Sequence, residues 1–155
     1  MGRPAGFRRR LAALGARSLW AVPSNTMMRA LQTEPPASSG RGRRPQRPWH
    51  SVAVWSEGLA EQAWQRIDVR DGAQGPLVVD IVTRRVGSRT HRRQQGEEEL
   101  VVVVRSRDRD QQQVVKVDDS LSNAAPETPL GACARVTNAA HRIAACLQRS
   151  KSEAG

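Results

Sequence analysis

Arginine side chains carry the clearest candidate chemistry in this sequence. Residues 1–50 contain ten arginines and one acidic residue, Glu34, whereas residues 51–110 contain ten residues of each sign. A guanidinium group binds phosphate through two parallel hydrogen bonds, so the net charge of +10 predicts a polyanion such as DNA as the partner. High-GC coding sequence also enriches arginine, and charge alone therefore does not decide the matter.

The densest basic segment lies near residue 40. Residues 35–45 are too rich in Pro, Gly and Arg to keep a helical or strand period, which predicts an exposed basic loop. Its arginines, together with the one that follows, are Arg41, Arg43, Arg44 and Arg47. We expect these side chains either to hold DNA phosphates or to be simply solvated, and the sequence favours neither reading.

A group of acidic residues could be imagined as a metal site. These residues are Asp108, Asp110, Asp118 and Asp119. Basic residues alternate with them and neutralise their charge: Arg105, Arg107, Arg109 and Lys116. This pattern favours a solvated hairpin loop over a metal site.

The histidine and cysteine residues give weaker indications of a functional site. His50, His91 and His141 are scattered, with no serine or cysteine context that would identify a nucleophile, so no catalytic role is predicted for them. Cys133 and Cys146 have neither a CxxC spacing nor a secretory context. Reduced thiols are therefore expected, without a zinc site or a disulfide.

The composition limits the core that could position such side chains. Only 38% of the residues are apolar and 3% aromatic, so we expect a modest core of Val, Leu and Ala. Trp49, Trp55 and Trp64 could stack on bases, but in a chain with so few aromatics a core position is favoured. No window approaches the roughly 18 apolar residues of a membrane span, which predicts a cytoplasmic protein without membrane contact.

The hydrophobic pattern predicts an α+β protein. An amphipathic helix over residues 7–16 precedes an apolar stretch, residues 19–22, that stops at Pro23. Helical spacing returns over about residues 129–152, where Val136 begins a predicted apolar stripe. Between these ends, four apolar runs predict strands of a small antiparallel sheet: residues 67–69, 77–82, 100–104 and 114–117.

Several phrases of the sequence, in collinear order, resemble DDE transposases of bacterial insertion sequences. They are MGRP and FRR (residues 1–4 and 7–9), AVPSNT (21–26), SGRGRRP (39–45), WQRIDVRDG (64–72), LSNA (121–124) and LQRSKSEAG (147–155). The resemblance spans nearly the whole chain, which makes it more specific than any single short motif.

This resemblance implies a ribonuclease-H-like α/β core interrupted by a β-rich insertion. Residues 1–33 would be part of that core, residues 34–125 the basic loop and the insertion, and residues 126–155 the final core helix. The first and second catalytic Asp of the family would lie upstream of Met1, so the chain is expected to be a C-terminal fragment.

The family's chemistry is phosphoryl transfer at two Mg²⁺ ions held by three carboxylates. Its final helix carries Arg-Ile-Glu-Glu with a Lys seven residues after the catalytic Glu, which implies phosphate-binding roles for Arg142 and Lys151. Ala144 occupies the catalytic Glu position and has no oxygen with which to ligate a metal. In another register Glu153 would be that residue, but a single carboxylate cannot assemble a two-metal site.

Three functions follow as expectations. The chain is a transposase remnant that cannot cut DNA alone and binds no metal cofactor, or it is a module whose arginines bind DNA or an intact transposase and inhibit it. The third possibility is a nuclease completed by another chain that supplies the carboxylates, and Ala144 argues against it.

Overall fold

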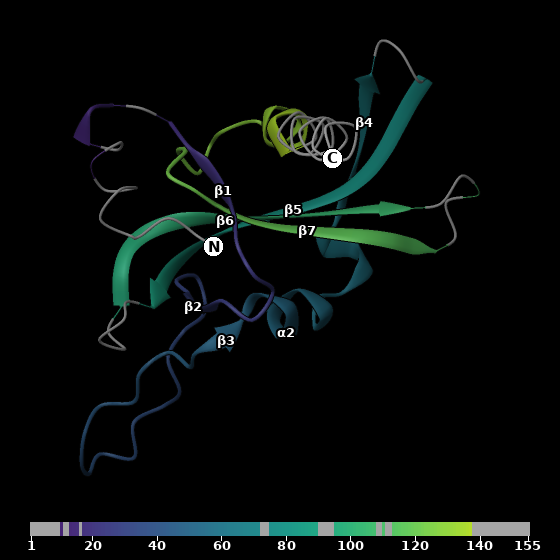
Figure 1. Ribbon diagram of the computed structural model, residues 1–155. Coiled ribbons are helices and arrows are strands. Elements are labelled where there is room, and N and C mark those ends of the chain that lie inside the picture. Colours follow the sequence, from purple (N-terminus) through teal and green to yellow (C-terminus); the bar gives the residue numbers. More distant parts are fainter. Residues whose placement is uncertain are drawn as a thin grey trace, which may run out of the picture.

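The computed structural model describes residues 10, 13–15, 17–71, 75–89, 95–107, 110 and 113–137. In this part of the chain, seven strands form one sheet in the order β1-β7-β6-β5-β2-β3, and β4 lies beside β5 (Figure 1). The strands are β1 (Leu19–Ala21), β2 (Met27–Ala30), β3 (His50–Ser51), β4 (Gln65–Asp71), β5 (Gly75–Arg89), β6 (Gln95–Arg107) and β7 (Val114–Ser122). The predicted α+β class with an antiparallel sheet is confirmed.

The four predicted central strands are present and longer than their apolar runs. β4, β5, β6 and β7 follow one another as antiparallel neighbours. The 15-residue β5 is long enough to pair with β4 over its first half and with β2 near its end. The hairpin predicted between residues 104 and 114 is confirmed, although β6 continues to Arg107 and shortens the connecting segment.

The run of residues 100–104 is continuously apolar because both faces of the sheet are covered. Leu100, Val102 and Val104 face one hydrophobic cluster, whereas Val101 and Val103 face another. All five side chains are at most 4% exposed. Strands buried on both faces lose the usual alternation of apolar and polar residues, and this explains the pattern.

Residues 130–137 form a helix that covers the first face (Figure 1). Leu130, Cys133 and Ala134 pack on the sheet, at the i, i+3, i+4 spacing of one helical face. Val136 is 51% exposed, so the predicted stripe that began there is wrong at this position. Residues 138–155, which hold the rest of that stripe, lie outside the described residues, as does most of the helix predicted over residues 7–16.

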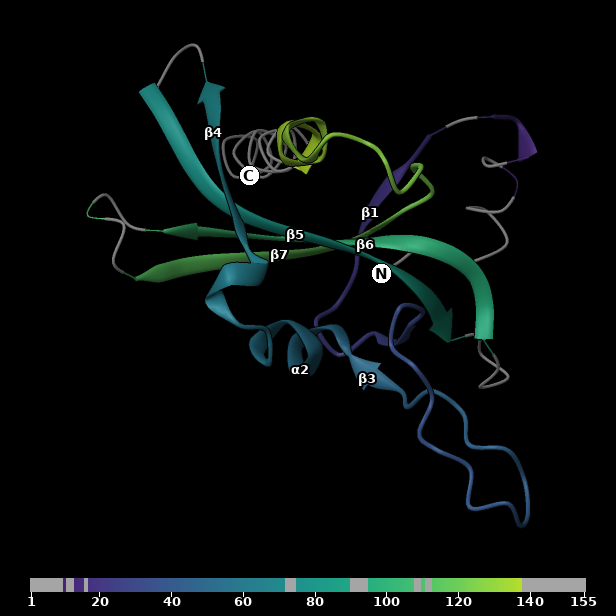
Figure 2. The same cartoon turned by 180° about the vertical axis from the view of Figure 1, so that it is seen from behind.

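The opposite face is covered by α2 (Val52–Glu57) and the short 3₁₀ helix η1 (Glu61–Ala63) (Figure 2). Val52 is fully buried there, and Trp55 and Trp64 pack at the margin of the second cluster. The expectation of a core position is therefore confirmed for these two tryptophans. Ser51 caps α2, because its hydroxyl oxygen accepts a hydrogen bond from the Val54 N–H at 3.2 Å.

The phrase LSNA (residues 121–124) ties β1 to its neighbour β7 at one edge of the sheet. The Asn123 side-chain oxygen accepts from the Ser18 N–H at 2.7 Å, and the Ser122 hydroxyl donates to the Ser18 carbonyl at 2.8 Å. The same hydroxyl accepts from the Ala124 N–H. These bonds fix the start of β1 beside the end of β7, so this phrase has a structural role.

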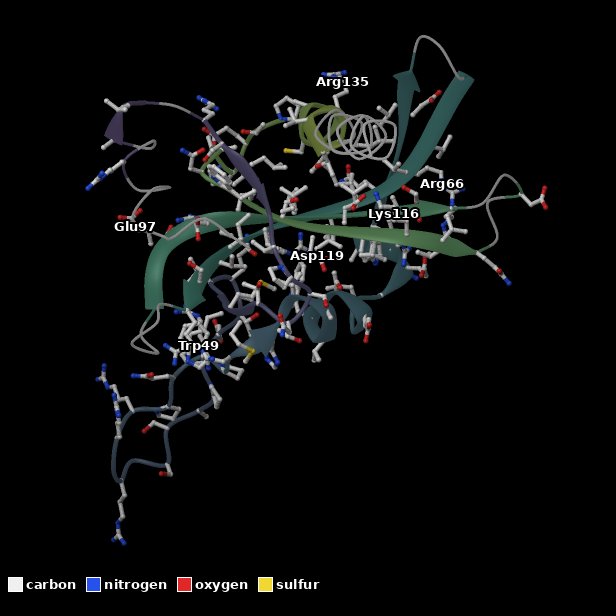
Figure 3. All side chains as sticks on the ribbon, in the orientation of Figure 1. Trp49, Arg66, Glu97, Lys116, Asp119 and Arg135 are labelled. Carbon is white, nitrogen blue, oxygen red and sulfur yellow. The ribbon has the colours of Figure 1, made fainter. Side chains whose placement is uncertain are left out.

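Asp119 lies on β7 opposite Val103, on the face covered by α2 (Figure 3). One of its carboxylate oxygens is buried without a hydrogen-bond partner, and burial together with the neighbouring Asp118 raises its pKa. An acid with a raised folded-state pKa contributes stability below its unfolded pKa and loses it as the pH rises through the folded value. Ionised Asp119 therefore destabilises the fold near neutral pH.

Asp119→Asn is accordingly expected to raise the free energy of unfolding at pH 7 by about 1 kcal/mol. The gain should shrink as the pH falls toward the ordinary range of an aspartate. Urea unfolding at several pH values measures this difference, with the exposed Glu127→Gln as the control for loss of one negative charge. A gain that is independent of pH would contradict the assignment.

Candidate nucleic-acid interface

The segment between β2 and β3, residues 31–49, leaves the sheet as a long loop that we call the basic arm (Figure 1). Arg41, Arg43 and Arg44 are exposed on it, as the sequence predicted. Gly40 and Gly42 have φ values of +76° and +85°, a conformation that other residues adopt at a cost. Two glycines that alternate with arginines therefore turn the chain where its guanidinium groups are most concentrated.

The root of the arm is fixed to the sheet by arginine and tryptophan. The Arg29 guanidinium of β2 stacks 4.1 Å from the centre of the Trp49 ring, and its Nη2 donates to Gln46 Oε1 at 3.1 Å. Arg47 Nε donates to the Thr33 carbonyl at 2.6 Å and so ties the two limbs of the arm together. Trp49 thus acts as a stacking platform for Arg29 where the arm meets the sheet (Figure 3).

An open pocket lies at this root. It is lined by Arg29, Pro35, Pro45, Gln46 and Arg47. The Arg29 Nε is buried and has no hydrogen-bond partner. Two guanidinium groups and an amide around one hollow provide donors and positive charge, which suits an anion such as a phosphate group.

A second group of arginines lies on the face of the sheet that carries α2 and η1. Arg66, Asp80 and Arg105 stand directly opposite one another on β4, β5 and β6. The Asp80 carboxylate accepts from Arg66 Nε at 3.3 Å, from Arg105 Nε at 3.2 Å and from Arg107 Nε at 2.7 Å. We call these four residues, with Glu61 of η1, the sheet-face network.

Glu61 closes the outer side of this network. Its Oε2 accepts from Arg105 Nη2 at 2.6 Å and from Arg107 Nη2 at 3.4 Å. The hydrogen bond from Arg105 is the main reason that the pKa of Glu61 is lowered. Arg105 also stacks 4.0 Å from the centre of the Trp64 ring, which holds its guanidinium plane in place.

Asp80 is the buried anchor of the network, with a side chain that is 5% exposed. Burial opposes its ionisation, but hydrogen bonds from Arg107 and Arg66 outweigh that cost and lower its pKa. No role was predicted for Asp80, which interrupts the otherwise apolar run of residues 77–82. A carboxylate in such a strand is a usable signal, because a buried charge requires partners on the neighbouring strands.

The predicted acidic loop is corrected in two respects. Asp118 and Asp119 belong to β7 and not to a connecting loop. Asp118 pairs with Lys116 at 3.1 Å, and Arg105 and Arg107 both take part in the sheet-face network. Within the described residues, no three His, Cys, Asp or Glu side chains are placed to hold a metal ion.

Several predicted positions lie outside the described residues: Arg142, Ala144, Lys151, Glu153, Cys146, His91 and His141. His50 is exposed at the start of β3. Cys133 is free and buried, and burial raises the pKa of its thiol.

Comparison of the chain with protein-family models, with curated proteins and with solved structures found no match. No helix in the described part of the chain is long and apolar enough to cross a membrane. The candidate interface therefore stands on the geometry of the arm and of the sheet-face network.

Proposed function

We propose that this chain is a remnant of a DDE transposase that binds DNA through the basic arm and does not cut it. The observation that carries the proposal is the exposure of Arg41, Arg43 and Arg44 on an arm that projects from the sheet (Figure 1). An arm of this kind can follow a DNA backbone, since guanidinium groups bind phosphates without reading base edges.

The loss of strand cleavage follows from the resemblance to transposases. Ala144 stands where the family has its catalytic Glu, and alanine supplies no oxygen ligand. Mg²⁺ would supply activation of the nucleophile in an intact family member, but this chain's residue at that position does not fit it. We also propose that β1 and the helix over residues 130–137 derive from a ribonuclease-H-like core, with β4–β7 as its β-rich insertion.

The root pocket gives the arm a defined first contact. Arg29, held flat against Trp49, and Arg47, held by the Thr33 carbonyl, present donors in a fixed geometry. Ordered side chains lose less conformational entropy on binding than free ones. A phosphate at the root would direct the adjoining backbone along the three exposed arginines.

This function is tested by measuring the affinity for a labelled DNA duplex by fluorescence anisotropy over a series of salt concentrations. Five arginine contacts predict a slope of about −4.5 in log affinity against log salt, or about a 500-fold loss between about 50 and 200 mM. The same samples incubated with Mg²⁺ should leave the duplex intact. A slope near zero would contradict the proposal that the arm binds DNA. Cleavage of the duplex would contradict the proposal that the chain cannot cut DNA.

A second candidate function is inhibition of an intact transposase by pairing with it. The exposed valines of β7 favour it, since Val115 is 64% and Val117 49% exposed. β6 pairs with one edge of β7, but on the other edge the only described strand, β1, pairs with Ser120–Ser122 alone. The preceding part of that edge can therefore accept a strand from a partner. Copurification with a full-length transposase would separate this function from DNA binding.

A further inference from the structure

We propose that Arg105 and Arg107 form a second anion site, which Glu61 occupies in the free protein and from which a phosphate group displaces it. One oxygen of Glu61 lies between the Nη2 atoms of the two guanidinium groups, at 2.6 and 3.4 Å. The position of an oxyanion between two converging donors is thus already defined by the protein's own carboxylate.

Glu61 is the replaceable member of the network. Its side chain is 72% exposed, and η1, which it begins, has no side-chain hydrogen bond at its N-cap. Ion pairs that are open to water contribute little to stability, because water and salt screen them. Asp80, by contrast, is 5% exposed and accepts from three arginines, so it remains in place when Glu61 leaves.

The site stays organised after displacement. Asp80 holds the Nε atoms of Arg105 and Arg107, and the Trp64 ring supports the Arg105 plane. Their Nη2 groups therefore keep facing the space that the Glu61 carboxylate leaves. A phosphate oxygen placed in that space would accept from both Nη2 groups, as the Glu61 oxygen does in the free protein.

This site is separate from the basic arm. Figure 3 places Trp49, at the root of the arm, and Arg66, in the sheet-face network, at opposite ends of the molecule. The inference therefore does not depend on DNA binding by the arm. The ligand is defined by its phosphate chemistry, which either a nucleic-acid backbone or free phosphate can provide.

Titration calorimetry of the full chain with inorganic phosphate, at constant ionic strength and pH 7, tests the site. Glu61→Gln should raise phosphate affinity about 10-fold, because a site that is open about a tenth of the time binds that much more weakly. Glu57→Gln, an equal loss of charge on the exposed end of α2, should leave the affinity unchanged. Arg107→Gln should abolish the phosphate binding that Glu61→Gln strengthens.

Circular dichroism melts would establish that each variant is folded, and Arg107→Lys serves as a milder variant if Arg107→Gln is not. Equal phosphate affinity in the wild type, Glu61→Gln and Glu57→Gln would overturn the proposal. The source of the phosphate is distinguished by a DNA duplex added to Glu61→Gln. Competition between duplex and phosphate supports a nucleic-acid backbone as the ligand, and phosphate binding without competition supports the free anion.

Discussion

Replacing Arg41, Arg43 and Arg44 together by glutamine weakens DNA binding on the order of 100-fold near about 100 mM salt, if the arm holds phosphates as proposed. Each lost contact removes about 0.9 from the slope of log affinity against log salt, so the slope should fall by about 2.7. The stability of the fold should not change, because all three side chains are exposed and outside the hydrophobic clusters.

A matched variant distinguishes the effect of the arm on DNA affinity from the effect of net charge. Arg10, Arg17 and Arg135 are also exposed but lie outside the arm and outside the strands that flank it, so their triple replacement by glutamine removes the same charge. It should keep most of the affinity. If both triple variants bind equally weakly, the arm has no special role and attraction is spread over the surface.

A lysine version of the arm refines the test. Lysine keeps the charge of Arg41, Arg43 and Arg44 but lacks the planar fork that holds two phosphate oxygens. The salt slope should then remain near that of the wild type, while the affinity falls only modestly. Loss of the slope with lysine would show that geometry, and not counterion release, dominates the contact.

Much of the sheet could be predicted because its apolar runs are short, rich in valine and separated by polar segments. The run of residues 100–104 is an example, since β-branched residues favour strands and burial of both faces permits a continuous run. The basic arm was also predictable, because its proline and glycine residues interrupt both the helical and the strand pattern of apolar residues. These features are local, and local patterns are what a single sequence records.

The short helix α2 could not be predicted by the same means. Val52 and Val54 favour a strand by propensity, and six residues are too few to display a helical period. The Ser51 cap is the local signal, but burial of Val52 against the sheet is what stabilises the helix. The stripe placed at Val136 failed for a related reason, since the sheet and not the helix selects which face is buried.

The partners of charged residues were the least predictable part of the candidate site. Arg105 lies close in sequence to Asp108 and Asp110, yet it pairs with Asp80, 25 positions away, and with Glu61, 44 positions away. Strand register brings these residues together, and register follows from the hydrophobic faces of the whole sheet. A reading of neighbouring charges therefore assigned Arg105 to the wrong acids.

The carboxylate that holds this network should be the most sensitive polar position in the fold. Asp80→Asn is expected to lower the free energy of unfolding by about 3 kcal/mol, because breaking a buried pair leaves uncompensated charge inside. Arg105 and Arg107 have side chains only 12% and 16% exposed, so water cannot replace the lost partner well. Urea unfolding followed by circular dichroism measures the loss.

Asp68→Asn is the control, since Asp68 is an exposed aspartate on β4 and its loss should change stability by less than about 0.5 kcal/mol. Equal effects at both positions would refute the role of Asp80.

The pH dependence of the stability gives a second criterion. The pKa of Asp80 is lowered by its arginines, so its contribution is present above the unfolded pKa and is lost as the pH falls through the folded value. The difference in free energy of unfolding between Asp80→Asn and wild type should therefore shrink as the pH falls. The difference for Asp119→Asn should also shrink in acid, but at pH 7 Asp119→Asn is the more stable protein, whereas Asp80→Asn is the less stable one.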